Sequence, residues 1–230
     1  MSRKLTHAQV YAFILDRLDE AGSPRWDKPQ VSRVFNAVYA DWLRASCDKL
    51  LERDEKARRE LGPLTISTSR PITSLIVDLE ALNPTLYRLV SVSAEWDRNV
   101  RNQNGQLVPR TDSWPVSPIR HDQKATAKID PWNRPTDDKA RYSESRRQEK
   151  EEDQRPVELT LHCTSQPSRI LIDYVHEPKM VDFRATPEGQ TEIGYDTQIE
   201  LMRRTVAMLA TTDENFPAAQ AGYSEIQINT

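Results

Sequence analysis

Histidines, cysteines and neighbouring carboxylates are the side chains of this sequence that could bind a metal or carry out catalysis. The histidines are far apart in the chain, at His7, His121, His162 and His176. A metal site needs clustered ligands, and a nucleophile needs an adjacent base. His162 and Cys163 are adjacent, but neighbours on a strand point to opposite faces. We therefore expect structural roles for these side chains, and we predict no catalytic and no metal-binding residue.

Phosphate-binding and nucleophile motifs are also missing from the sequence. The glycines are isolated, so that neither GxGxxG nor a P-loop nor GxSxG occurs. The paired acids Asp137-Asp138 and Glu151-Glu152 lie in hydrophilic segments, where a carboxyl group stays solvated rather than acquiring a raised pKa. The sequence gives no support for an enzyme, and we expect no cofactor.

Aromatic and charged side chains in connecting segments are better candidates for binding another protein. Trp26, Trp114 and Trp132 all lie in proline-rich segments. Aromatic side chains are enriched at interfaces, but these could equally anchor a loop on its own domain. The charged stretch LERDEKARRELG, residues 51–62, is either a solvated helix with pairs such as Glu52–Lys56 or a subunit contact.

Three helices are expected around a β-rich middle. Apolar spacing predicts a first helix after Thr6, which ends near Gly22, and a last helix that begins near Asp196. The second helix is expected from Asp27 to Gly62, about thirty residues and roughly 45 Å long. One end of it is expected to project beyond the core.

Alternating apolar residues predict strands in the middle of the chain. They are expected at 75–77, 87–96, 157–161 and 169–176. Asn104-Gly105 is a hairpin signal, and the proline-interrupted 107–116 is expected to be an edge strand or a loop. A short helix is expected over 119–128. Residues 143–155, which contain five acids and four bases, are expected to form a solvated hairpin tip or a mobile loop.

This order of elements predicts the α+β class, with a bundle of about three helices, a mostly antiparallel β-sheet or sandwich insertion, and extended arms. The expected domains are an N-terminal helical hairpin over 1–66, a β-rich domain over 67–183 and a C-terminal segment over 184–230. The helix and tail of that last segment are expected to pack on the helical part.

Composition excludes several classes of function. The chain has 230 residues, 37% of them hydrophobic, and a formal net charge of −3. A DNA-gripping protein needs clustered cations, and this charge balance argues against one. No apolar run reaches the ~18–20 residues of a membrane span, and acids interrupt the N-terminal apolar stretch where a secretory signal would need continuity. Two separate cysteines, Cys47 and Cys163, favour a reducing compartment and synthesis in a cytoplasm.

Four segments together resemble the head–tail connector proteins, also called adaptor or ring proteins, of tailed bacteriophages of the short-tailed or crAss-like type. The first two are VSRVFNAVYADWLRASCDKLLERDEKARRELGPL, residues 31–64, and the strand LYRLVSVSAEW, residues 86–96. The third is KIDPWNRPTDDKARY, residues 128–142. The fourth is RILIDYVHEPKMVDF followed by TEIGYDTQIELMRRTVAMLA, residues 169–183 and 191–210.

The resemblance implies a virion structural protein, made in the host cytoplasm and located in the neck or tail region. It implies a ring, typically twelvefold, that binds the portal protein and further connector or tail proteins. DNA would pass through the lumen without sequence-specific binding, and no membrane is involved. A tail-completion or terminator protein is the alternative within the virion, and a cytoplasmic enzyme or nucleic-acid adaptor is the alternative outside it. The candidate interaction residues are Glu52, Arg53, Glu55, Arg59, Trp114, Trp132, Arg146, Arg147, Glu151, Glu152, Phe216 and Tyr223.

Overall fold

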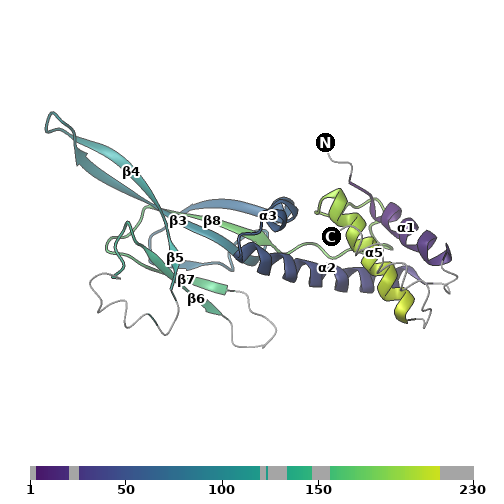
Figure 1. Cartoon of the computed structure of the whole chain (residues 1–230). Coiled ribbons are helices and arrows are strands. Elements are labelled where there is room, and N and C mark those ends of the chain that lie inside the picture. The colour runs from purple at the N-terminus through teal and green to yellow at the C-terminus, as the bar shows by residue number, and fades with distance from the viewer. Residues whose placement is uncertain (1–3, 21–25, 120–122, 124–133, 147–155, 213–230) are drawn as a thin grey trace. The chain divides into compact units, whose positions relative to one another are not determined.

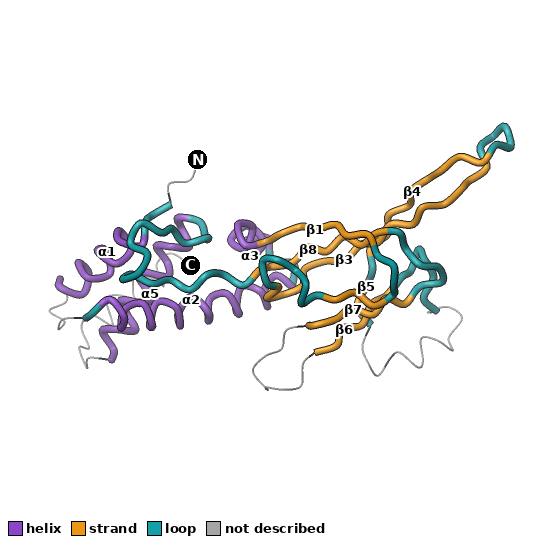
Figure 2. Tube along the Cα trace, turned by 180° about the vertical axis from the view of Figure 1, so that it is seen from behind, coloured by secondary structure: helices purple, strands orange, loops and turns teal. Residues whose placement is uncertain are grey.

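The computed structural model of the chain describes residues 4–20, 26–119, 123, 134–146 and 156–212. The chain divides into a helical unit, Met1–Leu64 with Pro178–Thr230, and a β unit, Thr65–Glu177 (Figures 1 and 2). The β unit is thus an insertion between two helical segments, and the protein is of the α+β class. The domains expected from the sequence placed these two boundaries after residues 66 and 183.

The helical unit contains α1 (His7–Glu20), α2 (Lys28–Leu51), α3 (Glu55–Leu61), the 3₁₀ turn η1 (Gly62–Leu64) and α5 (Tyr195–Thr212). Reciprocal side-chain bonds begin α2: the Gln30 amide donates to the Asp27 carboxylate at 2.8 Å, and the Asp27 amide donates to the Gln30 side chain at 3.1 Å. Thr6 and Gln9 repeat this arrangement at the start of α1. These bonds satisfy amides that have no partner inside the helix.

The predicted second helix is interrupted, and the expectation of one continuous helix to Gly62 is wrong. Arg53 adopts a positive φ of 66°, which ends α2. The Asp54 carboxylate then accepts the backbone amides of Lys56 and Ala57 at 2.7 and 3.3 Å, which begins α3. Lys56 therefore pairs with Glu60 on α3, at 4.0 Å, rather than with Glu52 as expected. The break gives the described residues four α-helices instead of the predicted three.

Residues 178–194, which we call the anchored loop, are irregular in backbone but tied to the helices. The Asn36 side chain donates to the Val181 carbonyl and accepts the Val181 amide, both at 2.9 Å. Phe183 is 1% exposed, with its ring centroid 5.6 Å from those of Phe35 and Tyr11. His7 Nδ1 lies 2.7 Å from the Thr186 carbonyl oxygen. The loop is therefore part of the core of the helical unit.

The β unit consists of two four-stranded sheets. The first sheet has the order β1-β8-β3-β4 and the second has the order β2-β7-β6-β5. The pairs are antiparallel except β5 with β6, which is parallel. Strand bounds are β1 Thr65–Pro71, β2 Ile76–Asp78, β3 Leu86–Arg101, β4 Leu107–Pro115, β5 Ser117–Pro118, β6 Arg141–Arg146, β7 Pro156–His162 and β8 Arg169–His176. The mostly antiparallel sheet expected from the sequence is present.

Buried side chains of both sheets form one hydrophobic cluster. It includes Val92 and Trp96 of β3, Leu159 of β7 and Ile172 of β8, each at most 3% exposed. Burial of such side chains contributes about 1.5–3 kcal/mol each, so this cluster holds the β unit together.

The observed strand pairing corrects two of the expectations from the sequence. β1 is a strand where none was expected, because its mostly polar sequence TISTSRP is held by hydrogen bonds to β8 rather than by an apolar face. The solvated tip expected over 143–155 is wrong for 143–146, which belong to β6, and Ser143 is 3% exposed. Residues 147–155, and nearly all of the short helix expected over 119–128, lie outside the described residues.

Candidate functional site

Strand β3 extends past β8, its neighbour on one side in the first sheet. Its pairing with β8 ends at Glu95, opposite Arg169, whereas its pairing with β4 continues to Arg101, opposite Leu107. The six residues beyond Glu95 cover roughly 20 Å at about 3.3 Å per residue. Figure 1 shows the resulting two-stranded ribbon projecting from the other strands of its unit. We call residues 97–112 the hairpin arm.

The tip of the hairpin arm is a tight turn centred on the predicted Asn-Gly signal. The Gly105 amide donates to the Asn102 carbonyl at 2.9 Å, and Gly105 has a φ of 78°. The Asn102 side chain accepts the amides of Asn104 and Gln106 at 3.0 and 2.9 Å. A turn that ends on a left-handed glycine is a common three- to five-residue hairpin connection. The sequence-based prediction of a hairpin here is confirmed.

Large apolar side chains on the hairpin arm are exposed. Leu107 is 63% exposed, Val108 40% and Val100 38%, and the predicted interaction residue Trp114 at the base of β4 is 38% exposed. β4 is an edge strand that carries Pro109 and Pro115, as its proline content suggested. A two-stranded ribbon with water on both faces is only marginally stable by itself. The arm therefore presents apolar surface that its own unit does not cover with described residues.

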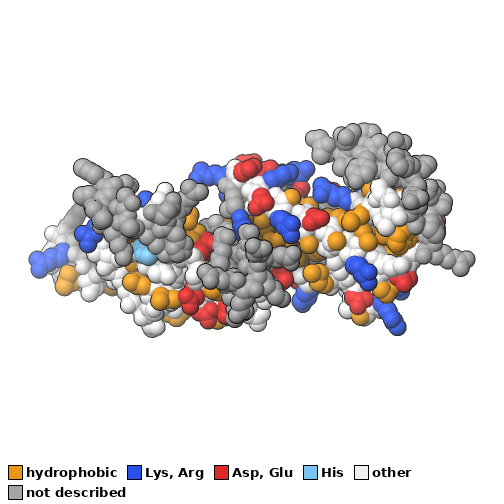
Figure 3. Space-filling view, turned by 90° about the horizontal axis from the view of Figure 1, so that it is seen from below, with side chains coloured by type: hydrophobic (Ala, Val, Ile, Leu, Met, Phe, Trp, Pro, Cys, Tyr) orange, Lys and Arg blue, Asp and Glu red, His pale blue; other side chains and the backbone are white. Residues whose placement is uncertain are grey.

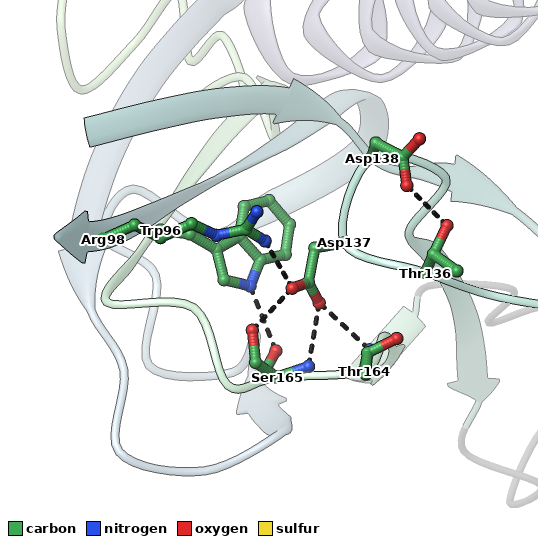
Figure 4. A network of polar contacts seen from close by, with 7 residues as sticks. All are labelled: Trp96, Arg98, Thr136, Asp137, Asp138, Thr164 and Ser165. Carbon is green, nitrogen blue, oxygen red and sulfur yellow. Dashed lines mark hydrogen bonds and ion pairs between the residues drawn. The ribbon is translucent and has the colours of Figure 1, made fainter. Parts of the chain in front are cut away.

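A polar network holds the base of the arm (Figure 4). Asp137 accepts the backbone amides of Thr164 and Ser165 at 3.0 and 2.8 Å and the Ser165 hydroxyl at 2.6 Å, and it pairs with the Arg98 guanidinium. The Trp96 indole donates to the Ser165 carbonyl at 3.0 Å. One carboxylate thus ties the segment before β6, the β7–β8 turn and the first residues of the arm together.

The environment of Asp137 favours its charged form. Partial burial by itself would raise the pKa of Asp137, but the hydrogen bonds from Ser165 and Thr164 and the charge of Arg98 outweigh it and lower the pKa below the usual range. The side chain of Asp137 is 13% exposed and that of Arg98 is 42% exposed. A carboxylate satisfied in this way acts as a structural clamp and is a poor proton donor or acceptor at neutral pH.

Two of the three arginines of the arm lie opposite one another across the ladder. Arg98 lies directly opposite Arg110, and the next pair on the same face is Val100 opposite Val108. Arg110 Nε lies 2.7 Å from Asp112 Oδ1, and Arg98 pairs with Asp137, so each of these two arginines has an acidic neighbour. On the face drawn in Figure 3, cationic, anionic and apolar side chains are interspersed.

The candidate residues of the α2–α3 break lie together in the helical unit. Glu52 and Arg53 form the break, and Glu55 and Arg59 lie on α3; all four are exposed. Arg146 is the last residue of β6. The remaining candidates lie outside the described residues: Trp132, Arg147, Glu151, Glu152, Phe216 and Tyr223.

The side chains first considered for chemistry are distributed over both units. His7 bonds to Thr186 in the helical unit, whereas His162 bonds to Ser143 and His176 to the Glu177 carbonyl in the β unit. Cys47 is buried, and burial together with the Asp137 charge raises the pKa of Cys163. In the described part of the chain, no three metal-ligating side chains are grouped to hold an ion. None of the helices there is both long and apolar enough to cross a membrane.

Sequence reasoning found Trp114 and the tip of the hairpin but missed Val100, Leu107 and Val108. No local signal marked these residues, because the sequence predicted a strand only over 87–96, whereas β3 has sixteen residues. A comparison of the chain with protein-family models and with curated proteins finds no match.

Proposed function

We propose that this chain is a virion structural protein: a subunit of the head–tail connector ring that lies below the portal of a tailed bacteriophage. The observation that carries the proposal is the hairpin arm, a ribbon that projects from its unit with Val100, Leu107 and Val108 exposed. A surface of this kind gains stability when another chain covers it.

A closed ring requires two different surfaces on each subunit, one that reaches out and one that receives. The hairpin arm supplies a surface that reaches out. The exposed charged corner at the α2–α3 break, with Glu52, Arg53, Glu55 and Arg59, supplies a separate surface for the portal or for another connector or tail protein. In this proposal the ring, typically twelvefold, contributes a platform on which the tail assembles.

The charge of the chain fits a channel through which DNA slides. Clustered cations bind phosphates and hold DNA, whereas this chain has a net charge of −3. The proposal therefore includes passage of DNA without sequence-specific binding, and it assigns no catalytic residue or cofactor.

Mass spectrometry and electron cryomicroscopy of purified particles test the proposal. We expect the chain in intact virions, as a ring between portal and tail. A position at the far end of the neck or tail would instead identify a tail-completion or terminator protein. Absence of the chain from particles would overturn a virion role, and salt-dependent DNA binding by the purified protein would then favour a nucleic-acid adaptor.

A further inference from the structure

Among the described residues of the β unit, exposed large apolar side chains occur in two places. One is the hairpin arm with the adjacent Trp114, and the other is the pair Leu75 and Ile76 at β2, which are 37% and 55% exposed. In the helical unit the exposed large apolar residues are separated in the sequence, at Met180, Tyr195 and Met208. The β unit therefore has two apolar surfaces to explain.

The surface on the arm is a continuation of the core face of the first sheet. The buried residues Ala94 and Trp96 alternate along β3, and Arg98 and Val100 follow on the same face. Across the ribbon, Arg110 lies opposite Arg98 and Val108 lies opposite Val100. This face, which we call the arm face, thus presents two arginines, each paired with an acidic neighbour (Asp137 or Asp112), followed two residues later by a pair of valines.

The surface at β2 has the opposite charge. Val77 points into the core, so Ile76 and Asp78 point outward. Across the ladder Glu158 of β7 lies opposite Asp78, and Thr160 lies opposite Ile76. Asp78, Glu158 and Ile76 are all exposed. This surface, the receiving face, thus presents a pair of anions followed two residues later by Ile76 and Thr160.

The two faces match in charge and in spacing. Each has one cross-strand pair of like charges and, about 7 Å along the strands, one pair with apolar surface. Like charges directly opposite one another destabilise a ladder, and a partner of opposite charge offsets that cost. Asp78 also accepts the Glu80 amide, and Glu158 accepts the Ser145 hydroxyl at 3.4 Å. Each guanidinium has five N–H donors, so Arg98 and Arg110 can keep their own acidic neighbours and still donate to another carboxylate.

The two faces of one copy cannot meet each other. The receiving face is the side of the second sheet that points away from the shared core, whereas the arm extends from the first sheet. We propose that the arm face of one copy docks on the receiving face of a second copy, with Val100 and Val108 against Ile76 and the arginines against Asp78 and Glu158. The contact joins two different surfaces, so it propagates from copy to copy.

This inference deepens the proposed function by naming its subunit contact, and mixed disulfide trapping tests it with the full-length protein. One preparation carries Val108→Cys and the other Ile76→Cys, and the natural cysteines are kept. Under mild oxidation the mixture should give at least fivefold more cross-linked dimer than either preparation alone. Mixing Val108→Cys with Met208→Cys is the matched control, because Met208 is 47% exposed but lies outside both faces. A dimer yield no higher than in that control would overturn the proposed contact.

Sedimentation velocity provides a second measurement. Val108→Asp places a charge at the apolar pair and should weaken self-association about tenfold, which corresponds to loss of one buried side chain. Met208→Asp should leave self-association unchanged. If the Val108→Asp protein associates as well as the wild type, the arm is not the contact. A ring in the virion that lacks this contact would overturn the inference but leave the proposed function intact. Disulfide cross-linking between the two faces of a protein that is absent from virions would support the contact and overturn the proposed function.

Discussion

The anchored loop and the hairpin arm are both long connecting segments, but they are held in place in opposite ways. The loop has little regular structure, yet Val181, Phe183 and Ile193 are each at most 2% exposed. The arm has a complete ladder of cross-strand pairs, yet Val100, Leu107 and Val108 remain exposed. Hydrogen bonding that water can replace contributes little net stability, whereas burial contributes much. Regular structure alone therefore does not show that a segment is held in place by its own domain.

Removing the ring of Phe183 should have the largest effect on stability. Its centroid lies 5.6 Å from those of Phe35 and Tyr11, and a Phe183→Ala cavity should cost about 3–5 kcal/mol of the free energy of unfolding. Urea denaturation followed by circular dichroism measures it. Val100→Ala in the arm is the control and should change stability by less than about 0.5 kcal/mol. Similar losses of stability for Phe183→Ala and Val100→Ala would contradict the contrast between the buried loop and the exposed arm.

A methyl group at Gly189 should have the next largest effect. A Cβ on Gly189 would lie 2.7 Å from His7 Cε1 and 3.0 Å from the Thr186 carbonyl oxygen, so the loop would have to move away from α1. Gly189→Ala should cost about 1–3 kcal/mol by overpacking. Gly194→Ala is the matched control, because nothing lies within 4 Å of a Cβ there. Equal melting temperatures for Gly189→Ala and the wild type would show that the loop is not fixed to the helix.

The clamp at the base of the arm should contribute a smaller, pH-dependent amount. Asp137→Asn removes a charge that accepts from Thr164, Ser165 and Arg98, and should cost about 1–2 kcal/mol at pH 7. Because the pKa of Asp137 is lowered in the folded protein, its stabilisation is present above the unfolded value, about 3.9, and is lost as pH falls through the folded pKa. The difference between wild type and variant should therefore shrink in acid.

Urea denaturation of both proteins between pH 7 and pH 2.5 measures that difference. Asp138→Asn is the comparison variant, because Asp138 is exposed and accepts the Thr136 hydroxyl rather than the amides of Thr164 and Ser165 (Figure 4); its pKa is lowered too, so its effect should have the same sign and a smaller size. If the difference in free energy of unfolding between the wild type and Asp137→Asn stays constant down to pH 2.5, the charged Asp137 carboxylate does not stabilise the base of the arm.

The same contrast explains which elements the sequence predicted. β8 and the Asn104-Gly105 turn were predicted because apolar alternation and turn chemistry are local signals. β1 was missed because its stability comes from pairing with β8, about a hundred residues away in the chain. The break between α2 and α3 was missed because Arg53 lies in a charged run that is typical of a helix, and a left-handed arginine leaves no compositional trace.

The candidate site was predicted only in part for a related reason. Trp114 was identified by its type and its proline-rich surroundings. Val100, Leu107 and Val108 were not, because an apolar residue beside a turn is exposed or buried according to where the neighbouring strand stops. β8 stops opposite Glu95, and no local pattern in β3 or β4 marks that position. The exposed surface is thus a property of the sheet rather than of the segment that bears it.

The smallest expected effect is at Leu107, and it bears directly on why the arm exists. Leu107 is 63% exposed, so Leu107→Ser should change the free energy of unfolding of the isolated subunit by less than about 0.5 kcal/mol in urea denaturation. Leu89, at 7% exposed on the sheet-bound part of β3, is the matched position, where Leu89→Ser should cost several-fold more. A large loss at Leu107 would mean that its own chain covers the arm. A negligible loss would mean that the folded subunit does not need this leucine, as the proposed contact of the arm with another chain requires.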